Sequence, residues 1–406
     1  MRTQRIAFEN RDGHRLTGRL VTPADRHPHN FVLFAHCFTC NKNLTALRNI
    51  ANALAREGFG VLRFDFTGLG ESEGDFGDTN FSGNVEDLED AARYLEERYA
   101  APSLLVGHSL GGAAVLFAAA RLPFVKAVAV IGAPADPEHV THLLRSEIPE
   151  IEKEGKARVT IGGREFTIKA QFLQDLQSHS LPAVVQDLDA ALLILHSPQD
   201  RIVSIVNAEE IYREARHPKS FISLDGASHL LENQADSTYT GGVIASWASR
   251  YVPWPEQPSL KSDHQVVASL DGDDGFTTEM KVGNHYLTAD EPRNYGGQDF
   301  GPSPYELLSA SLSACTAMTL QMYAKRKGWP LENVEVHTSY GKEHAKDGAA
   351  CLDDPEARID TFRREILLGG PLEAGQRKRL LEIADRCPVH RSLSSPTQIL
   401  SEQSPE

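Results

Sequence analysis

The chain has 406 residues, of which 41% are hydrophobic, 24% charged and 7% aromatic. This length is typical of two or three domains, and the composition excludes a disordered, collagen-like or disulfide-scaffold protein. The formal net charge of −15, with no basic tract, argues against nucleic acid or an anionic membrane as a partner.

Cysteines are few, and leader and membrane-spanning patterns are missing from the sequence. Five cysteines are too few for a secreted disulfide framework, and an odd number leaves one unpaired. The first residues lead into polar sequence without the apolar core of a signal peptide, and no run of about 18 apolar residues follows. We therefore expect a cytoplasmic protein that binds no membrane.

Residues 1–251 are expected to form an α/β domain. Short, almost continuously apolar runs alternate with helical patterns, as in a parallel sheet that is buried on both faces. The expected strands are 31–36, 60–66, 104–107, 126–131, 191–196 and 220–224, and two of the helices are 44–57 and 84–99. This alternation predicts a mostly parallel sheet with helices on both faces.

The segment 138–188 interrupts this rhythm. It is polar and helical at first, and then contains two β-rich runs on either side of Gly162-Gly163, which predict a hairpin. We expect this segment to be a cap inserted over the sheet edge where ligands bind.

A proline-rich segment, 252–262, is predicted to be a linker, because its closely spaced prolines can neither continue a helix nor pair in a central strand. In the following domain, 263–406, strands are grouped with strands, which indicates an α+β fold. The expected elements are a meander at 266–270, 277–282 and 285–289, a long helix at 303–327, strands at 334–340 and 361–368, and helices at 373–386 and 388–395.

The sequence Gly107-His-Ser-Leu-Gly111 fits the G-x-S-x-G pattern of a nucleophile elbow, between an expected strand and an expected helix. Ser109 is therefore the candidate nucleophile. A serine nucleophile needs a base and an acid that orients it, and in this fold they follow in the order acid, then histidine. Asp200 and His229 follow the next strand ends in that order. Two nearby residues are interpreted differently: Asp225 as a cap of its own loop, and His196 as a hydrogen-bond donor that supports the site.

The loop after the strand 31–36 reads His36-Cys-Phe-Thr-Cys40, and with the elbow and the turn Asp65-Phe-Thr-Gly-Leu-Gly-Glu-Ser72 it resembles the α/β-hydrolase family over residues 15–250. The resemblance implies that the backbone amides of Phe38 and Leu110 form the oxyanion hole. Cys37 and Cys40 stand where the family often has glycine. For them we favour buried thiols over a disulfide switch, and a zinc site would need two further ligands.

Two cysteines of the second domain differ in setting. Cys315 lies in a helix with small and apolar residues on all sides, so the residues alone predict a helix that is buried all round and an inert thiol. The helix begins with Ser303, Pro304 and Glu306, which predict an N-cap and a capping box. Cys387 precedes Pro388 and a short helix, next to Arg386, which favours a reactive thiolate.

The helix around Cys315, the segment from Gly296-Gly297 to Asp299 and the motif Arg386-Cys-Pro-Val-His-Arg391 resemble the OsmC/Ohr family over residues 263–400. The resemblance implies an intertwined homodimer that reduces organic hydroperoxides, with Cys315 peroxidatic and Cys387 resolving 72 residues later. A dithiol would regenerate the pair. The family also uses a glutamate and an arginine to assist the thiol. Here the glutamate's position holds Tyr305, with Glu306 next to it, and the early meander has no arginine, so Glu306 and Arg293 are the nearby candidates. Cys351 has no partner in the pattern.

The whole chain thus resembles a fusion of an α/β hydrolase with an OsmC-like domain. We expect a serine esterase that acts on small acyl esters, joined to a thiol domain that reduces organic hydroperoxides, with no cofactor and no metal. The alternatives are a peptidase or thioesterase in place of the esterase, and a second domain that serves only to dimerise the chain.

Overall fold

The computed structural model describes residues 1–161, 164–254, 260–272, 275–344 and 358–403. The chain divides into two compact units, Met1–Ser259 and Leu260–Glu406. Part of the predicted linker, 255–259, lies outside the described residues, as do the predicted turn at Gly162-Gly163 and Cys351. Within the described ranges, no helix is both long and apolar enough to span a membrane.

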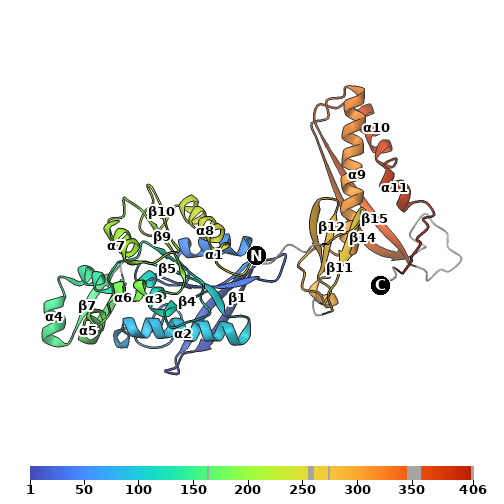
Figure 1. Ribbon diagram of the computed structural model, residues 1–406. Coiled ribbons are helices and arrows are strands. Elements are labelled where there is room, and N and C mark those ends of the chain that lie inside the picture. The colour runs from blue at the N-terminus through green and yellow to red at the C-terminus, as the bar shows by residue number, and fades with distance from the viewer. Residues whose placement is uncertain (162–163, 255–259, 273–274, 345–357, 404–406) are drawn as a thin grey trace. The chain divides into compact units, whose positions relative to one another are not determined.

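An eight-stranded sheet forms the centre of the first unit, in the order β1-β2-β4-β3-β5-β6-β9-β10 (Figure 1). Its strands are β1 Arg2–Glu9, β2 Arg15–Thr22, β3 Asn30–Ala35, β4 Phe59–Phe64, β5 Pro102–His108, β6 Ala127–Ile131, β9 Ala191–His196 and β10 Lys219–Ser223. The six from β4 to β10 are parallel, which confirms the predicted fold class. The antiparallel hairpin β1–β2 was not predicted, because β1 lacks a continuous apolar run.

Each central strand sends alternate side chains into two separate cores. In β3, Leu33 and Ala35 belong to one core, whereas Val32 and Phe34 belong to the other. The first core is covered by α2 Phe81–Arg98, α3 Leu110–Ala119 and α7 Val206–Glu214, and the second by α1 Thr45–Arg56 and α8 Gln234–Ala248. Because both faces are buried, these strands read as continuous apolar runs in the sequence.

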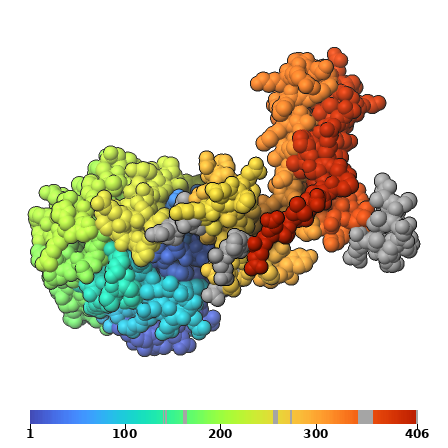
Figure 2. Space-filling model, turned by 45° about the vertical axis from the view of Figure 1, so that its right-hand side comes forward, coloured from blue at the N-terminus to red at the C-terminus, as the bar shows by residue number. Residues whose placement is uncertain are grey.

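The insertion predicted at 138–188 contains the expected hairpin, whose strands flank the undescribed turn. Its elements are η2 Pro137–Leu144, α4 Ile148–Glu154, β7 Lys156–Ile161, β8 Arg164–Lys169, α5 Ala170–Gln177 and α6 Leu181–Gln186. The insertion is tied to the start of α2, where the hydroxyl and amide of Ser82 donate to the carboxylate of Asp175 over 2.7 and 2.8 Å. In Figure 2 this green segment lies on the outside of the unit.

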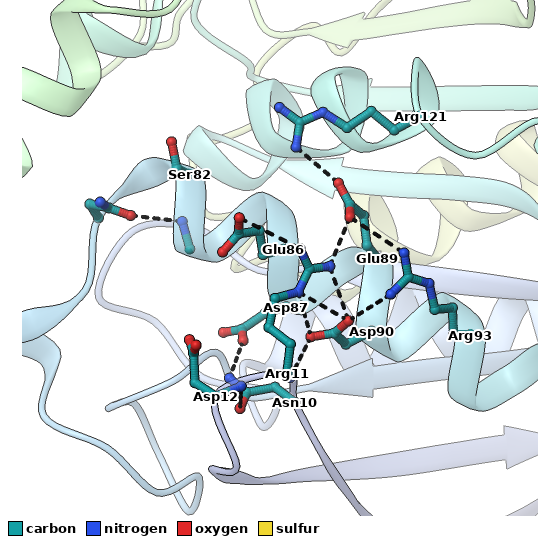
Figure 3. A network of polar contacts seen from close by, with 12 residues as sticks. Asn10, Arg11, Asp12, Ser82, Glu86, Asp87, Glu89, Asp90, Arg93 and Arg121 are labelled. Atoms are coloured by element: carbon teal, nitrogen blue, oxygen red, sulfur yellow. Dashed lines mark hydrogen bonds and ion pairs between the residues drawn. The ribbon is translucent and has the colours of Figure 1, made fainter.

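A partly exposed charge network, in which the acids are buried, fastens the β1–β2 turn to α2 (Figure 3). The Arg11 guanidinium pairs with Asp90 at 3.0 Å and with Glu89 at 2.8 Å, and Arg121 pairs with the other oxygen of Glu89 at 3.0 Å. These acids raise the pKa of Arg11, which therefore stays charged. Asp87, which accepts from the Asn10 amide at 2.8 Å, has its pKa raised by burial. The network thus ties the edge hairpin to α2 through charged side chains.

The second unit contains two separate antiparallel sheets and a long central helix. The meander is β11 Val266–Ser269, β12 Thr278–Val282 and β13 His285–Ala289, and the hairpin is β14 Asn333–His344 with β15 Arg358–Gly369. The helices are η3 Arg293–Tyr295, α9 Pro304–Lys327, α10 Ala374–Ala384 and α11 Pro388–Leu393. Helices α9 and α10 lie side by side in both views (Figures 1 and 2). Ser303 caps α9 and forms the predicted capping box with Glu306.

Helix α9 is not buried on all sides, so that prediction was wrong for the single chain. Its buried residues form one stripe at four-residue spacing: Leu312, Thr316, Leu320 and Ala324. On another face Met318 and Met322 are 65% and 72% exposed. Among the described residues of this unit, the apolar cluster against α9 has six buried members: Leu320, Ala324, Leu331, Leu380, Ile383 and Ala384. The described residues of the second unit therefore leave much apolar surface of α9 uncovered.

Candidate active site

The elbow serine sits in a backbone conformation that few residues adopt. Ser109 follows β5 and precedes α3 with φ 56° and ψ −128°, and its N–H donates to the carbonyl of Ile131 over 2.8 Å. A side chain at Gly111 would lie 2.3 Å from the carbonyl oxygen of His36, so only glycine lets the elbow approach the loop after β3. The predicted strand–turn–helix setting of Ser109 is thus present, with the strain typical of functional sites.

Asp200 and His229 come together at the ends of neighbouring strands β9 and β10. His229 Nδ1 lies 2.7 Å from Asp200 Oδ2, and the two side chains are only 8% and 2% exposed. The other carboxylate oxygen accepts the backbone N–H groups of Ile202 and Val203 over 2.8 and 3.0 Å. Burial opposes the charged form, but the hydrogen bonds from His229 and the two amides outweigh it and lower the pKa of Asp200. The acid is therefore an anion that fixes the histidine ring.

Asp225 and His196, the other acid and histidine near this site, do not take the place of Asp200 or His229. Asp225 is exposed and accepts from the hydroxyl of Ser223 over 2.8 Å. His196 is buried, with Nε2 2.8 Å from the carbonyl of Val203 and 3.6 Å from the carboxylate of Asp200. It supports the loop that carries the acid.

His108 supports the histidine loop in a way that the sequence did not predict. Its Nε2 lies 2.7 Å from the backbone carbonyl of His229, to which it donates. Burial, and then the proximity of the His229 ring, lower the pKa of His108 to about 3, so the ring stays neutral at physiological pH. The sequence places His108, a polar residue, at the end of an apolar strand beside the elbow. Nothing in the sequence identified the carbonyl of His229 as its partner.

Residues 36–42, which we call the oxyanion loop, bring Phe38 to the elbow. Phe38 and Leu110 line the same small cavity, together with Phe66, Leu69 and Phe76. The Phe38 ring stacks on Phe172 of the insertion, with centroids 5.3 Å apart. The two predicted oxyanion donors therefore belong to one wall of one cavity.

The start of the oxyanion loop is fixed by His36, which is buried. Its Nδ1 lies 2.8 Å from the carbonyl of Cys37, and the N–H of Phe66 approaches its Nε2 at 3.5 Å. Since Nε2 accepts, Nδ1 carries the hydrogen and donates. Burial lowers the pKa of His36, which favours this neutral form.

The far end of the oxyanion loop is held by a buried ion pair that was not predicted. The side chains of Lys42 and Asp65 are at most 1% exposed, and Lys42 Nζ contacts the carboxylates of Asp65 and, at 3.0 Å, of Glu71. The backbone N–H of Lys42 also donates to Asp65 over 2.6 Å, and that of Glu71 over 2.9 Å. Asp65 therefore joins the oxyanion loop to the turn after β4.

Cys37 and Cys40 form a disulfide, which corrects the expectation of two buried thiols. The loop makes a tight turn in which the N–H of Cys40 donates to the carbonyl of Cys37 over 3.1 Å, and the two Cα atoms lie 5.3 Å apart. This separation is within the range that a disulfide bridges. Thr39, between them, has a left-handed φ of 61°.

The two cysteines of the second unit that the structure describes, Cys315 and Cys387, are both free and lie on facing elements. Cys315 on α9 is partly exposed, whereas Cys387, the N-cap of α11, is buried. The Sγ of Cys387 accepts the N–H of His390 at 3.3 Å and lies 3.6 Å from the hydroxyl of Thr316, the residue that follows Cys315. The fold thus brings Cys387 beside the turn of α9 that carries Cys315.

Arg364 on β15 is a charged residue bonded to one side of this contact, and it was not predicted. Its guanidinium donates to the hydroxyl of Thr316 over 2.8 Å, and lies 2.9 Å from both Asp385 and the Nδ1 of His390. Glu306 is exposed and serves in the capping box, and Arg293 is exposed on η3. Among the described residues, neither has a contact with Cys315. In the sequence, Arg364 is a charged residue in a strand with other charged residues, and nothing there indicates a role beside the cysteines.

Comparison with known proteins agrees with this division of the chain. A serine aminopeptidase (S33) family model matches residues 26–159, and an OsmC-like protein model matches residues 296–402. The esterase domain of a Rhodothermus marinus protein is 49% identical, with a TM-score of 0.52, and covers 62% of this chain and 99% of that one.

Two curated relatives match the first unit. The uncharacterized protein YfhR of Salmonella typhimurium is 26% identical over 235 residues, which are 55% of this chain and 74% of that protein. The mitochondrial palmitoyl-protein thioesterase ABHD10 of Mus musculus is 31% identical over 154 residues, 36% of this chain and 50% of that protein.

The first unit is therefore a hydrolase-type domain and the second a thiol-bearing α+β domain. The chain belongs to the α/β hydrolases through its first unit and carries an OsmC-like domain in its second, as the resemblance predicted.

Proposed function

We propose that the first unit is a serine carboxylesterase that hydrolyses small acyl esters. The hydrogen-bonded pair of Asp200 and His229, at strand ends next to the strained elbow of Ser109, carries this proposal. The Rhodothermus marinus protein, which matches nearly over its whole length, is described as an esterase domain, and this supports an ester as the substrate.

The chemistry follows from the donors and acceptors of the site. Because His229 Nδ1 bonds to Asp200, its Nε2 is free to take the proton of the Ser109 hydroxyl as the oxygen attacks the acyl carbon. The amides of Phe38 and Leu110 stabilise the oxyanion. His229 then returns the proton to the leaving alkoxide, and water hydrolyses the acyl-serine by the same steps. The anionic Asp200 stabilises the imidazolium in both halves.

The cavity beside Phe38 and Leu110 supports a small acyl group. Its walls include Phe66, Leu69 and Phe76, and its space is small. Apolar walls favour an alkyl chain over a charged group, and the tight packing disfavours a long one. We expect kcat/KM to fall steeply from acetyl to octanoyl esters.

The test measures hydrolysis of p-nitrophenyl acetate, butyrate and octanoate by the wild type and by Ser109→Ala. We expect Ser109→Ala to lose at least about 10³-fold in kcat. Equal rates in the two proteins refute the proposal. A matched thioester and an aminoacyl p-nitroanilide test the alternatives, which are favoured by the similarity to ABHD10 and to the serine aminopeptidase model.

We propose in addition that the second unit pairs with a second copy of the chain. Met318 and Met322 are exposed on α9, and the apolar cluster that packs against this helix among the described residues is small. A helix that is apolar on several faces is normally covered. Analytical ultracentrifugation of the full chain should give a dimer, and Met318→Glu/Met322→Glu a monomer. Tyr239→Glu on α8, also at an exposed apolar residue, is the control and should stay dimeric.

For the two thiols we propose reduction of organic hydroperoxides. The Cys315 thiolate would attack the peroxide, release the alcohol and become a sulfenic acid, which Cys387 would convert to a disulfide with loss of water. The contact of Cys387 with Thr316, next to Cys315, supports this pairing. A dithiol restores both thiols. We expect the wild type to consume cumene hydroperoxide and the Cys315→Ser variant not to consume it. If the wild type consumes none, assembly is the remaining role of this unit.

A further inference from the structure

The disulfide of the oxyanion loop has no part in the ester chemistry, yet it encloses one of the groups that this chemistry needs. Cys37 and Cys40 close a ring over Phe38 and Thr39. The amide proposed to stabilise the oxyanion belongs to Phe38, inside this ring. Any change in the bond therefore acts first on that amide.

The flanks of the ring are anchored independently of the disulfide. On one side His36 is held by its hydrogen bonds to Cys37 and Phe66. On the other side Lys42 is held by the buried carboxylate of Asp65. Opening the disulfide would therefore leave both flanks in place and release mainly the two residues between the cysteines.

The backbone inside the ring includes a residue in an unfavourable conformation. Thr39 is β-branched and has a left-handed φ of 61°, a conformation that such residues avoid. Within the turn, the disulfide, the hydrogen bond from Cys40 N–H to the Cys37 carbonyl and a hydrogen bond from the Thr39 hydroxyl to the Phe38 carbonyl over 2.7 Å hold it there. Once the disulfide is opened, Thr39 can return to an ordinary conformation, and the peptide of Phe38 turns with it.

The two sulfur-bearing residues differ in access. Cys37 is buried, with 4% of its surface exposed, whereas Cys40 is partly exposed. An attacking thiolate reaches a disulfide through its more accessible sulfur, which makes Cys40 the point of attack and Cys37 the leaving group.

We propose that Cys37–Cys40 is a thiol–disulfide exchange site for a small dithiol and that it regulates the hydrolase: the disulfide form is active and the dithiol form is impaired. A thiolate of the dithiol forms a bond to Cys40 Sγ, the Cys37–Cys40 bond breaks, and Cys37 leaves as a thiolate and takes up a proton. The second thiol then displaces Cys40. The dithiol ends as a disulfide, and two electrons and two protons pass to the protein. The regulatory part of this inference rests on the proposed esterase function.

The experiment uses the full chain with Cys315→Ser, Cys351→Ser and Cys387→Ser, in which Cys37 and Cys40 are the only cysteines. The protein is treated with dithiothreitol under native conditions, the reductant is removed under argon, and hydrolysis of p-nitrophenyl acetate is measured before and after treatment. Alkylation followed by mass spectrometry counts the free thiols at 37 and 40. Reoxidation with diamide completes the cycle.

We expect two alkylated cysteines after reduction, a fall in kcat of about tenfold with a smaller change in KM, and recovery on reoxidation. Outright removal of an oxyanion donor costs about 10²–10³-fold, and a displaced donor costs less. The double variant Cys37→Ser/Cys40→Ser should have the low kcat and should not respond to the dithiol.

Two results overturn the inference: an unchanged or higher kcat when both cysteines are alkylated, or a disulfide that native protein never exchanges although denatured protein does. The proposed esterase is judged separately. If Ser109→Ala hydrolyses the ester as fast as the wild type, the proposed function fails whatever the thiol state. If Ser109-dependent hydrolysis is unchanged after the disulfide is reduced, only the regulatory inference fails.

Discussion

Replacing Lys42 by methionine tests how firmly the oxyanion loop is anchored. The methionine fills much of the same space but has no charge, so the Asp65 carboxylate stays buried without its cation. Asp65 keeps the backbone N–H groups of residues 42 and 71, at 2.6 and 2.9 Å. Removing one partner of a buried ion pair costs about 3–5 kcal/mol. We expect a loss of that size in the free energy of unfolding of the first unit.

The double variant Lys42→Met/Asp65→Asn separates the buried charge from the packing. The asparagine keeps the shape of the carboxylate and removes the charge at position 65, but one backbone N–H loses its acceptor. The remaining cost is about 1–3 kcal/mol, so the double variant should be more stable than the single one. Lys153→Met is the matched control, because Lys153 is 80% exposed and pairs only on the surface; its effect should stay within about 0.5 kcal/mol.

Urea titration followed by the loss of Ser109-dependent ester hydrolysis reports on the first unit alone. In native buffer, kcat should fall more than KM rises, because the loop acts on the transition state. A loss below about 1 kcal/mol for Lys42→Met, or a double variant no more stable than the single one, would refute the account of Asp65 as a charged anchor.

Three further predictions concern the acid, the buried imidazole and the arginine of the second unit. Asp200→Asn should lower kcat about 10⁴-fold with little change in KM, measured by ester hydrolysis, since the histidine loses the anion that fixes its tautomer. The pKa of His108 is lowered to about 3, so below pH 6.5 the unfolded chain binds a proton that the folded chain excludes. The stabilisation that neutral His108 contributes to the fold is complete above pH 6.5, and it decreases by up to about 1.4 kcal/mol per pH unit as the pH falls towards 3. The urea midpoint of unfolding, measured at pH 7, 6 and 5, should therefore fall less steeply for His108→Gln than for the wild type. Arg364→Met should speed hydrogen exchange in α11 and destabilise it by about 1.5–3 kcal/mol, because Thr316 and His390 lose a charged donor; unchanged exchange there would contradict this.

The triad candidates could be predicted because the chemistry itself constrains the sequence. A serine hydrolase of this fold needs its serine at a glycine-flanked elbow and its acid and histidine at later strand ends, and each constraint is local. Asp200 was therefore preferred to Asp225 from strand position alone, and the 2.7 Å contact with His229 agrees with that choice.

The supporting residues could not be predicted, because their roles depend on tertiary contacts. His108 bonds to a carbonyl 121 residues away, and Lys42 meets a carboxylate 23 residues away. Cys37 and Cys40 illustrate the same limit within four residues. The C-x-x-C spacing fits thiols, a metal site and a disulfide alike, and only the tight turn at Thr39 selects the disulfide.

The wrong prediction for α9 has a different origin, which we propose is burial against a second copy of the chain rather than within one chain. The buried residues of α9 are the stripe of Leu312, Thr316, Leu320 and Ala324. Met318 and Met322 fall outside this stripe, although burying each would contribute about 1.5–3 kcal/mol. Apolar residues placed where the folded chain gains nothing from them are best explained by a second copy that covers them. Because they lie outside the unit's core, Met318→Glu/Met322→Glu should remove the dimer and leave the helices of each chain folded, which circular dichroism can check.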